Sequence, residues 1–153
     1  MSSFIKSNAF RSPATAATYT AITGAAPQTV NGNTVAIMAP NGGSGMAIAP
    51  GSLSALVEAR LTTNTITATG KWQVTAGGAS PTWYDVGVGN NAANVAIATG
   101  TGSLVATNKV VSAPEACYGW LFSRFVITSG VGVGGGAGVD EVAISYSYRL
   151  MTP

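Results

Sequence analysis

The chain has 153 residues, 46% of them hydrophobic and only 8% charged, with a net charge of +2 and no His. This length suits a single domain with its own core. The Lys and Arg residues are scattered singly, so they do not form the basic surface of a nucleic-acid-binding protein. With no His and a single Cys, Cys117, the sequence argues against a zinc site, a disulfide within the chain and an activated nucleophile. We expect no cofactor, no metal and no enzymatic activity, with Cys117 as a small buried residue.

The low charge points to partners. Typical domains carry roughly a quarter charged residues. Either Ser, Thr, Asn and backbone groups hydrate the surface, or other subunits cover much of it. The cores of protein interfaces are depleted in charge, which favours the second explanation. The N-terminus has no hydrophobic signal-peptide region, and no 18-residue apolar run occurs, so we expect a cytoplasmically made chain without a membrane span.

Residues 1–34 are predicted to be an extended N-terminal arm. Pro13 and Pro27 break any helix, and Ala, Thr and Ser dominate. The large apolar side chains are too widely spaced for an amphipathic face; they include Phe4, Ile5, Phe10 and Tyr19. Such a segment is either a solvated terminus or an arm whose large side chains dock on a neighbouring subunit. The second interpretation makes these four residues candidate interface residues.

Short strands are predicted to follow from residue 35 to residue 153, which we assign to one β-sandwich domain. Turn residues separate them, and their β-branched and aromatic content is typical of strands. Residues 52–63 also fit a helix face, but alternation and the Thr-rich continuation favour a strand. The other expected strands are residues 34–38, 46–49, 71–75, 82–88, 94–99 and 104–111.

A hairpin over residues 70–89 is predicted at the centre of the fold. Its two arms, KWQVT and TWYDVGV, flank a Gly-, Ser- and Pro-containing turn. We expect Trp72 and Trp83 to anchor the core, and Tyr84 and Val86 to reach a neighbouring subunit. A sugar-stacking platform is the alternative for these aromatic residues, but alternation on strands favours core and interface positions.

The last two strands show the clearest period of two, over residues 120–128 and 142–150. The glycines between them formally match G-x-G-x-x-G, but the segment that follows is β-patterned, which argues against a dinucleotide site. Asp140 and Glu141 point to opposite faces of a strand and make a poor catalytic pair. The overall pattern predicts an all-β protein, an antiparallel β-sandwich or jelly roll with an extended N-terminal arm.

The hairpin and the C-terminal strands together resemble a known family. The segments GKWQV, TWYDV and ISYSYR, with the glycine loop over residues 130–138, are similar to those of tailed-phage capsid decoration, or cement, proteins. The resemblance covers residues 50–151. It implies a virion protein on the capsid surface that bridges neighbouring major capsid subunits. It also implies two partners, the major capsid protein and the chain itself as a homodimer or homotrimer.

Two other functions remain open from the sequence. A receptor- or carbohydrate-binding module of a phage head or tail fibre would share the fold class and the aromatic residues. A self-assembling surface or pilus-like protein would polymerise without a shell. Neither requires the catalytic groups that the sequence lacks.

Overall fold

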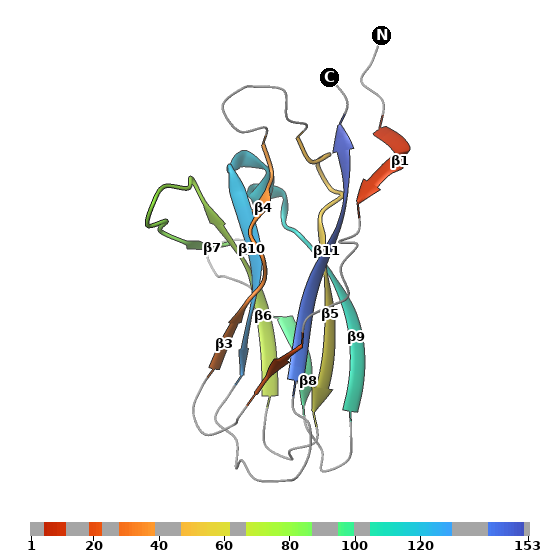
Figure 1. The fold of residues 1–153 in the computed structure, drawn as a ribbon, viewed down its shortest axis with the longest axis vertical. Helices are drawn as coiled ribbons and strands as arrows, with labels where there is room; N and C mark the ends of the chain where they lie inside the picture. Colours follow the sequence, from red (N-terminus) through yellow and green to blue (C-terminus); the bar gives the residue numbers. More distant parts are fainter. Residues whose placement is uncertain are drawn as a thin grey trace.

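The computed structural model describes residues 5–11, 19–22, 28–38, 47–61, 67–86, 95–99, 105–129 and 141–151. In this part of the chain the only helical element is a short 3-10 turn, η2 (Glu115–Gly119). All strand pairs are antiparallel, and they form two sheets that pack against each other (Figure 1). The predicted all-β antiparallel sandwich is confirmed.

The first sheet has the strand order β1-β11-β5-β9, with β2 also paired to β11. Its strands are β1 (Ile5–Arg11), β2 (Thr20–Ala21), β5 (Ser54–Leu61), β9 (Val105–Ser112) and β11 (Glu141–Met151). The second sheet has the order β3-β10-β6-β7, with β4 also paired to β10 and β8 to β6. Its strands are β3 (Gln28–Asn31), β4 (Val35–Ala36), β6 (Thr67–Thr75), β7 (Tyr84–Val86), β8 (Val95–Thr99) and β10 (Phe122–Ser129).

The connectivity is that of a jelly roll. The short strands β1 and β2, β3 and β4, and β7 and β8 each share one position in a sheet, so the described strands fill four positions per sheet. From β5 onward the chain alternates between the sheets, except where β6, β7 and β8 remain together in the second. Two four-stranded antiparallel sheets wound in this way define the fold that viral capsid and lectin domains share.

Alternating burial explains why these segments are strands. In β10, Ser123, Phe125 and Ile127 on the inner face are fully buried, whereas Arg124 and Thr128 on the other face are partly exposed and Val126 is buried as well. Residues 52–63, whose pattern also fitted a helix, contain a strand with the same alternation of buried and partly exposed side chains. Ala55, Val57 and Ala59 of β5 are buried and the residues between them are not, so the strand prediction is confirmed.

Three aromatic rings join the two sheets at the centre of the core. The Trp72 ring of β6 lies 5.3 Å from Phe125 of β10 and 6.0 Å from Tyr146 of β11, centroid to centroid. All three side chains are buried. Trp72 is therefore a core anchor, as predicted from the hairpin.

A β-bulge separates β3 from β4. Asn31 pairs with Val126 and Val35 with Ser123, so three residues, 32–34, lie opposite two residues of β10, 124–125. At the bulge the Gly32 N–H donates to the Phe125 carbonyl (2.8 Å). The Phe125 N–H donates instead to the Tyr146 hydroxyl oxygen of the opposite sheet (2.9 Å).

Parts of the predicted arm, residues 1–34, pair with strands of the sandwich predicted for residues 35–153. The described parts of the N-terminal region are extended, but β1 and β2 pair with β11, and β3 pairs with β10. Ile22 and Val30 are buried in the core. These short strands depend on partners more than 90 residues away in sequence, so local pattern alone marks them as a separate arm.

The hairpin prediction is corrected at Trp83. β6 and β7 do pair, with Val74 opposite Tyr84 and Trp72 opposite Val86. This register turns Val86 into the core and puts Trp83, one residue before Tyr84, on the outer face, where it stacks on Arg124. The predicted glycine loop over residues 130–138 lies outside the described residues.

Replacing Gly32 by Ala should destabilise the fold. A Cβ at Gly32 would lie 2.1 Å from the Tyr146 hydroxyl and 2.8 Å from the Phe125 carbonyl oxygen. Overpacking of this kind costs about 1–3 kcal/mol, and the cross-sheet hydrogen bond would be strained as well. Urea unfolding should show a lower free energy of unfolding for Gly32→Ala. Gly119→Ala is the control, because no atom lies within 4 Å of a Cβ at that position. Equal losses in the two variants would contradict this account of the bulge.

Candidate functional site

Three of the four acidic side chains in the described residues, those of Glu58, Asp85 and Glu141, are engaged in local contacts. Asp85 pairs with Lys71 (2.7 Å) and Glu141 with Arg60 (3.2 Å), while Glu58 accepts a hydrogen bond from Tyr19. No group of three or more His, Cys, Asp or Glu residues in the described ranges could hold a metal ion. Asp140 lies outside those ranges.

Cys117 is buried, as predicted. It is fully enclosed, and burial raises the pKa of its thiol. The Ser123 hydroxyl donates to its sulfur at 3.8 Å. An enclosed, protonated thiol is a packing group rather than a nucleophile.

Exposed large hydrophobic side chains gather at one end of the sandwich. In the described part of the chain four such residues are exposed: Met38 (46%), Tyr84 (52%), Leu121 (37%) and Val110 (65%). β4 ends and β10 begins at the upper end of the second sheet in Figure 1. Met38 follows β4 and Leu121 precedes β10, whereas Tyr84 begins β7 and its ring packs on Trp120, the neighbour of Leu121. Val110 lies apart, on β9 of the first sheet. We call Met38, Tyr84 and Leu121, with the half-buried Trp120, the apolar end.

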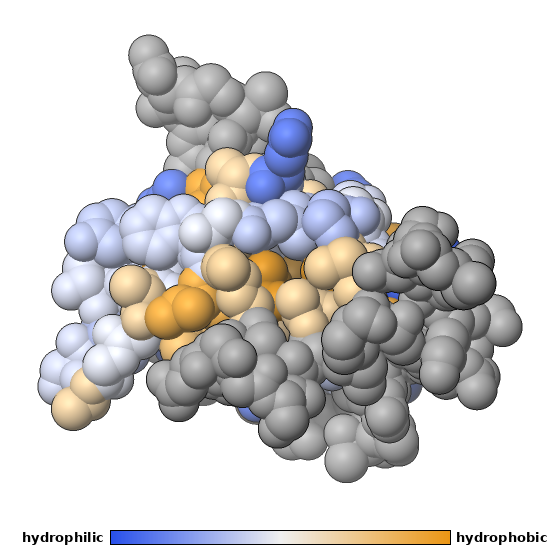
Figure 2. All heavy atoms as spheres, turned by 90° about the horizontal axis from the view of Figure 1, so that it is seen from above, coloured by the Kyte–Doolittle hydropathy of each residue, from blue (hydrophilic) through white to orange (hydrophobic). Residues whose placement is uncertain are grey.

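Backbone pairing and ring packing hold the apolar end together. The Ile37 N–H donates to the Leu121 carbonyl (2.8 Å), which brings the adjoining Met38 close to Leu121. The Tyr84 and Trp120 rings lie 5.5 Å apart and tilted by 34°. Figure 2, which looks down on this end, shows hydrophobic residues gathered in its middle beside a band of more hydrophilic ones.

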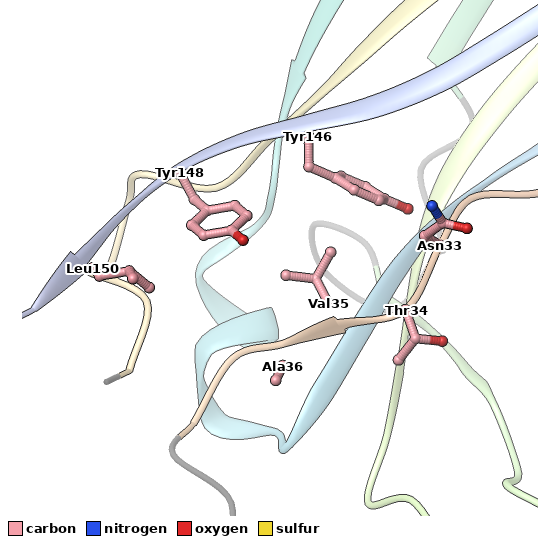
Figure 3. Close-up of a pocket in the computed structure, with 7 residues that line it drawn as sticks. All are labelled: Asn33, Thr34, Val35, Ala36, Tyr146, Tyr148 and Leu150. Carbon is pink, nitrogen blue, oxygen red and sulfur yellow. The ribbon is translucent and has the colours of Figure 1, made fainter. Parts of the chain in front are cut away.

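A hollow between the sheets adjoins the apolar end. It has a volume of about 370 Å³ and no charged residue in its lining, which consists of Asn33, Thr34, Val35, Ala36, Tyr146, Tyr148 and Leu150. In Figure 3 the side chains of Tyr146, Tyr148 and Leu150 extend from β11 towards the β4 segment, and Val35 extends towards them. The bulge before β4 forms one wall, so the same irregularity that engages Tyr146 also borders the hollow.

The arrangement favours binding of another surface over chemistry. Exposed apolar side chains lie beside an uncharged hollow. Contiguous apolar surface of this kind commonly marks interaction sites on soluble proteins.

The residues predicted to form an interface differ in exposure, and the structure describes the side chains of only some of them. Tyr84 is exposed at the apolar end, whereas Val86 is buried in the core and its side chain offers no contact surface. Tyr19 lies against its own chain, with its hydroxyl on Glu58 and its ring 4.4 Å from the Arg60 guanidinium carbon. For Ile5 and Phe10 the structure describes only the backbone, in β1, and Phe4 lies outside the described residues.

Sequence reasoning missed Met38, Leu121 and Tyr148 as site residues. Leu121 belongs to an alternating run, and its exposure follows only from its place just before β10 begins. A large apolar residue immediately before the start of a strand is the signal that could have identified it. Met38 carries no such signal, because its neighbour Leu121 is 83 positions away in sequence.

Comparison with protein-family models, curated proteins and solved structures gives no match for this chain. No helix in the described residues has the length and apolar character needed to cross a membrane. The geometry of the chain itself therefore carries the functional argument.

Alkaline pH should weaken the fold through Tyr146. Burial raises the pKa of Tyr146 from its usual value of 10.0 to about 12. Above pH 10 the unfolded chain releases this proton while the folded chain keeps it. The contribution of Tyr146 to the free energy of unfolding is therefore complete below pH 10 and is lost as the pH rises to 12. A shift of this size corresponds to roughly 2–3 kcal/mol.

Tyr146→Phe tests this contribution. At neutral pH the variant should lose about 1–3 kcal/mol, because the Phe125 N–H loses its acceptor. Between pH 10 and 12 its stability, measured by urea unfolding in steps of pH, should fall less steeply than that of the wild type. Parallel pH profiles would show that Tyr146 does not carry the effect.

Proposed function

We propose that this chain is a virion structural protein that binds the outer surface of a phage capsid and cements neighbouring major capsid subunits. The observation that carries the proposal is the apolar end. Met38, Tyr84 and Leu121 expose hydrophobic surface on a jelly roll in which only 8% of the residues are charged. A lattice-binding protein needs such a surface, because apolar burial is the main favourable term in protein association.

The scarcity of charge supports the same proposal. A free monomer gains solubility from charged side chains, whereas a subunit held in an assembly has much of its surface covered. Interface cores are depleted in charged residues and enriched in Tyr, Trp, Phe and Met. The apolar end contains three of these four residue types, in Met38, Tyr84 and Trp120.

Cementing follows from binding the assembled state alone. A surface that touches two shell subunits at once is complete only when the lattice has formed. Binding to one state stabilises that state by mass action, by about 2.7 kcal/mol when the free ligand is a hundredfold above its Kd. Association of the chain with itself, as a homodimer or homotrimer, belongs to the same proposal, because several linked contacts add avidity.

Removing the apolar side chains should weaken shell binding. The double variant Tyr84→Ser, Leu121→Ser should bind shells of the cognate major capsid protein about a hundredfold more weakly, since each large apolar side chain contributes about 1.5–3 kcal/mol when buried. Co-sedimentation of the purified chain with intact shells measures this affinity.

Val110→Ser is the matched control. It removes a more exposed hydrophobic side chain, but from β9 of the first sheet, so shell affinity should stay at the wild-type value. Equal loss in the two variants would indicate a general change in solubility. Unchanged binding by the double variant would exclude the apolar end as the shell-binding surface.

A further inference from the structure

The outer face of the second sheet carries a ladder of polar side chains across three neighbouring strands. Asp85 of β7 accepts hydrogen bonds from Lys71 (2.7 Å) and Gln73 (2.8 Å) of β6. The Gln73 amide oxygen accepts in turn from Arg124 Nε of β10 (3.0 Å). We call Lys71, Gln73, Asp85 and Arg124 the polar ladder. The Gln73 amide is engaged at both ends, so the ladder fixes the position of the guanidinium.

Trp83 completes the fixation of Arg124. The guanidinium carbon lies 4.1 Å from the centroid of the Trp83 ring, a cation–π distance. The guanidinium has five N–H donors. The Nε–H donates to Gln73, and the other four N–H groups lie on the two terminal nitrogens. A terminal pair of this kind can hold a carboxylate in a bidentate arrangement.

An aromatic hollow adjoins the ladder. It has a volume of about 230 Å³ and is lined by Thr34, Thr75, Gly77, Gly78, Pro81, Trp83 and Phe122. Gly77 has a φ of 86°, and a Cβ there would lie 2.9 Å from the Phe122 ring. Glycine therefore lets the Phe122 ring approach the turn, which leaves Phe122 and Trp83 as aromatic walls with two threonines beside them.

The charges of this surface favour an acidic ligand. Lys71 and Arg124 supply two positive charges against the single negative charge of Asp85. Hydrogen bonds from Lys71 and then from Gln73 hold the pKa of Asp85 below its usual value, so its carboxylate is ionised at neutral pH. One positive charge remains in excess beside the aromatic walls.

We infer that the polar ladder and the Trp83–Phe122 hollow form a binding site for an acidic saccharide, a pyranose ring that carries a carboxylate. The ring would pack its C–H face against the aromatic walls, its hydroxyl groups would meet Thr34 and Thr75, and its carboxylate would pair with Arg124. Ligand sites commonly combine apolar walls with a few fixed polar groups in this way. This site does not depend on the proposed shell binding, because it uses a different face and different residues.

Titration of the full-length chain with three small probes tests the ligand chemistry. Glucuronic acid carries both the pyranose ring and the carboxylate. Glucose carries the ring alone, and acetate carries the carboxylate alone. Two-dimensional NMR of the Trp indole N–H groups would follow binding. We expect glucuronic acid to shift the Trp83 signal at millimolar concentration and to bind about tenfold more tightly than glucose or acetate. No shift with glucuronic acid, or an affinity for glucose or acetate that equals the affinity for glucuronic acid, would overturn the inference.

Two variants and one control localise the site. Trp83→Ala and Arg124→Gln should each weaken glucuronic acid binding about tenfold or more, with melting temperatures used to confirm folding; for Trp83→Ala, binding is followed by calorimetry. Tyr84→Ala, next to Trp83 but on the other face of the strand, should leave saccharide binding intact. Loss of glucuronic acid binding in Tyr84→Ala, or its retention in Trp83→Ala and Arg124→Gln, would overturn the assignment. Because shell binding is expected to depend on Tyr84 and saccharide binding on Trp83, failure of one proposal can be told from failure of the other.

Discussion

The hydrogen bond from the Phe125 N–H to the Tyr146 hydroxyl connects the two sheets at the centre of the sandwich. It exists because the bulge at residues 32–34 diverts the edge of the second sheet, and because Gly32 has no side chain to occupy the same space. A buried backbone N–H without an acceptor costs about 1–3 kcal/mol. The position of Tyr146 also lets its ring pack on Trp72, so one polar contact fixes both the spacing of the sheets and the aromatic core.

The same bulge shapes the surface proposed to bind the shell. It borders the hollow lined by Tyr146 and Tyr148, and the chain that leaves it brings Met38 to Leu121. The outer face of the second sheet is polar instead, and its Lys, Gln, Asp and Arg side chains form hydrogen bonds with one another across strands. One sheet thus presents an apolar end and a polar face, a division that suits two kinds of partner.

The sequence predicted the parts of the fold that depend on local pattern. Period-two alternation identified β5, β10 and β11, and the aromatic hairpin identified β6, β7 and the core position of Trp72. The sequence did not predict the parts of the fold whose position depends on pairing with residues far away in the chain. The N-terminal strands acquire their place only by pairing with β11 and β10. Which face of the sheet Trp83 occupies depends on the register of β7, and a shift by one residue would reverse it. Because β7 has only three residues, the alternation of its side chains is too short to predict that register. The apolar end was only partly predicted, through Tyr84.

The central claim is that the apolar end is the surface that meets an assembled shell. Hydrogen exchange of the chain, free and bound to intact shells of the cognate major capsid protein, tests it most directly. The account predicts slower exchange on binding at residues 35–38 and 118–122, and unchanged exchange at residues 108–112 of β9. Protection confined to the first sheet, or no protection at either segment of the apolar end, would contradict it.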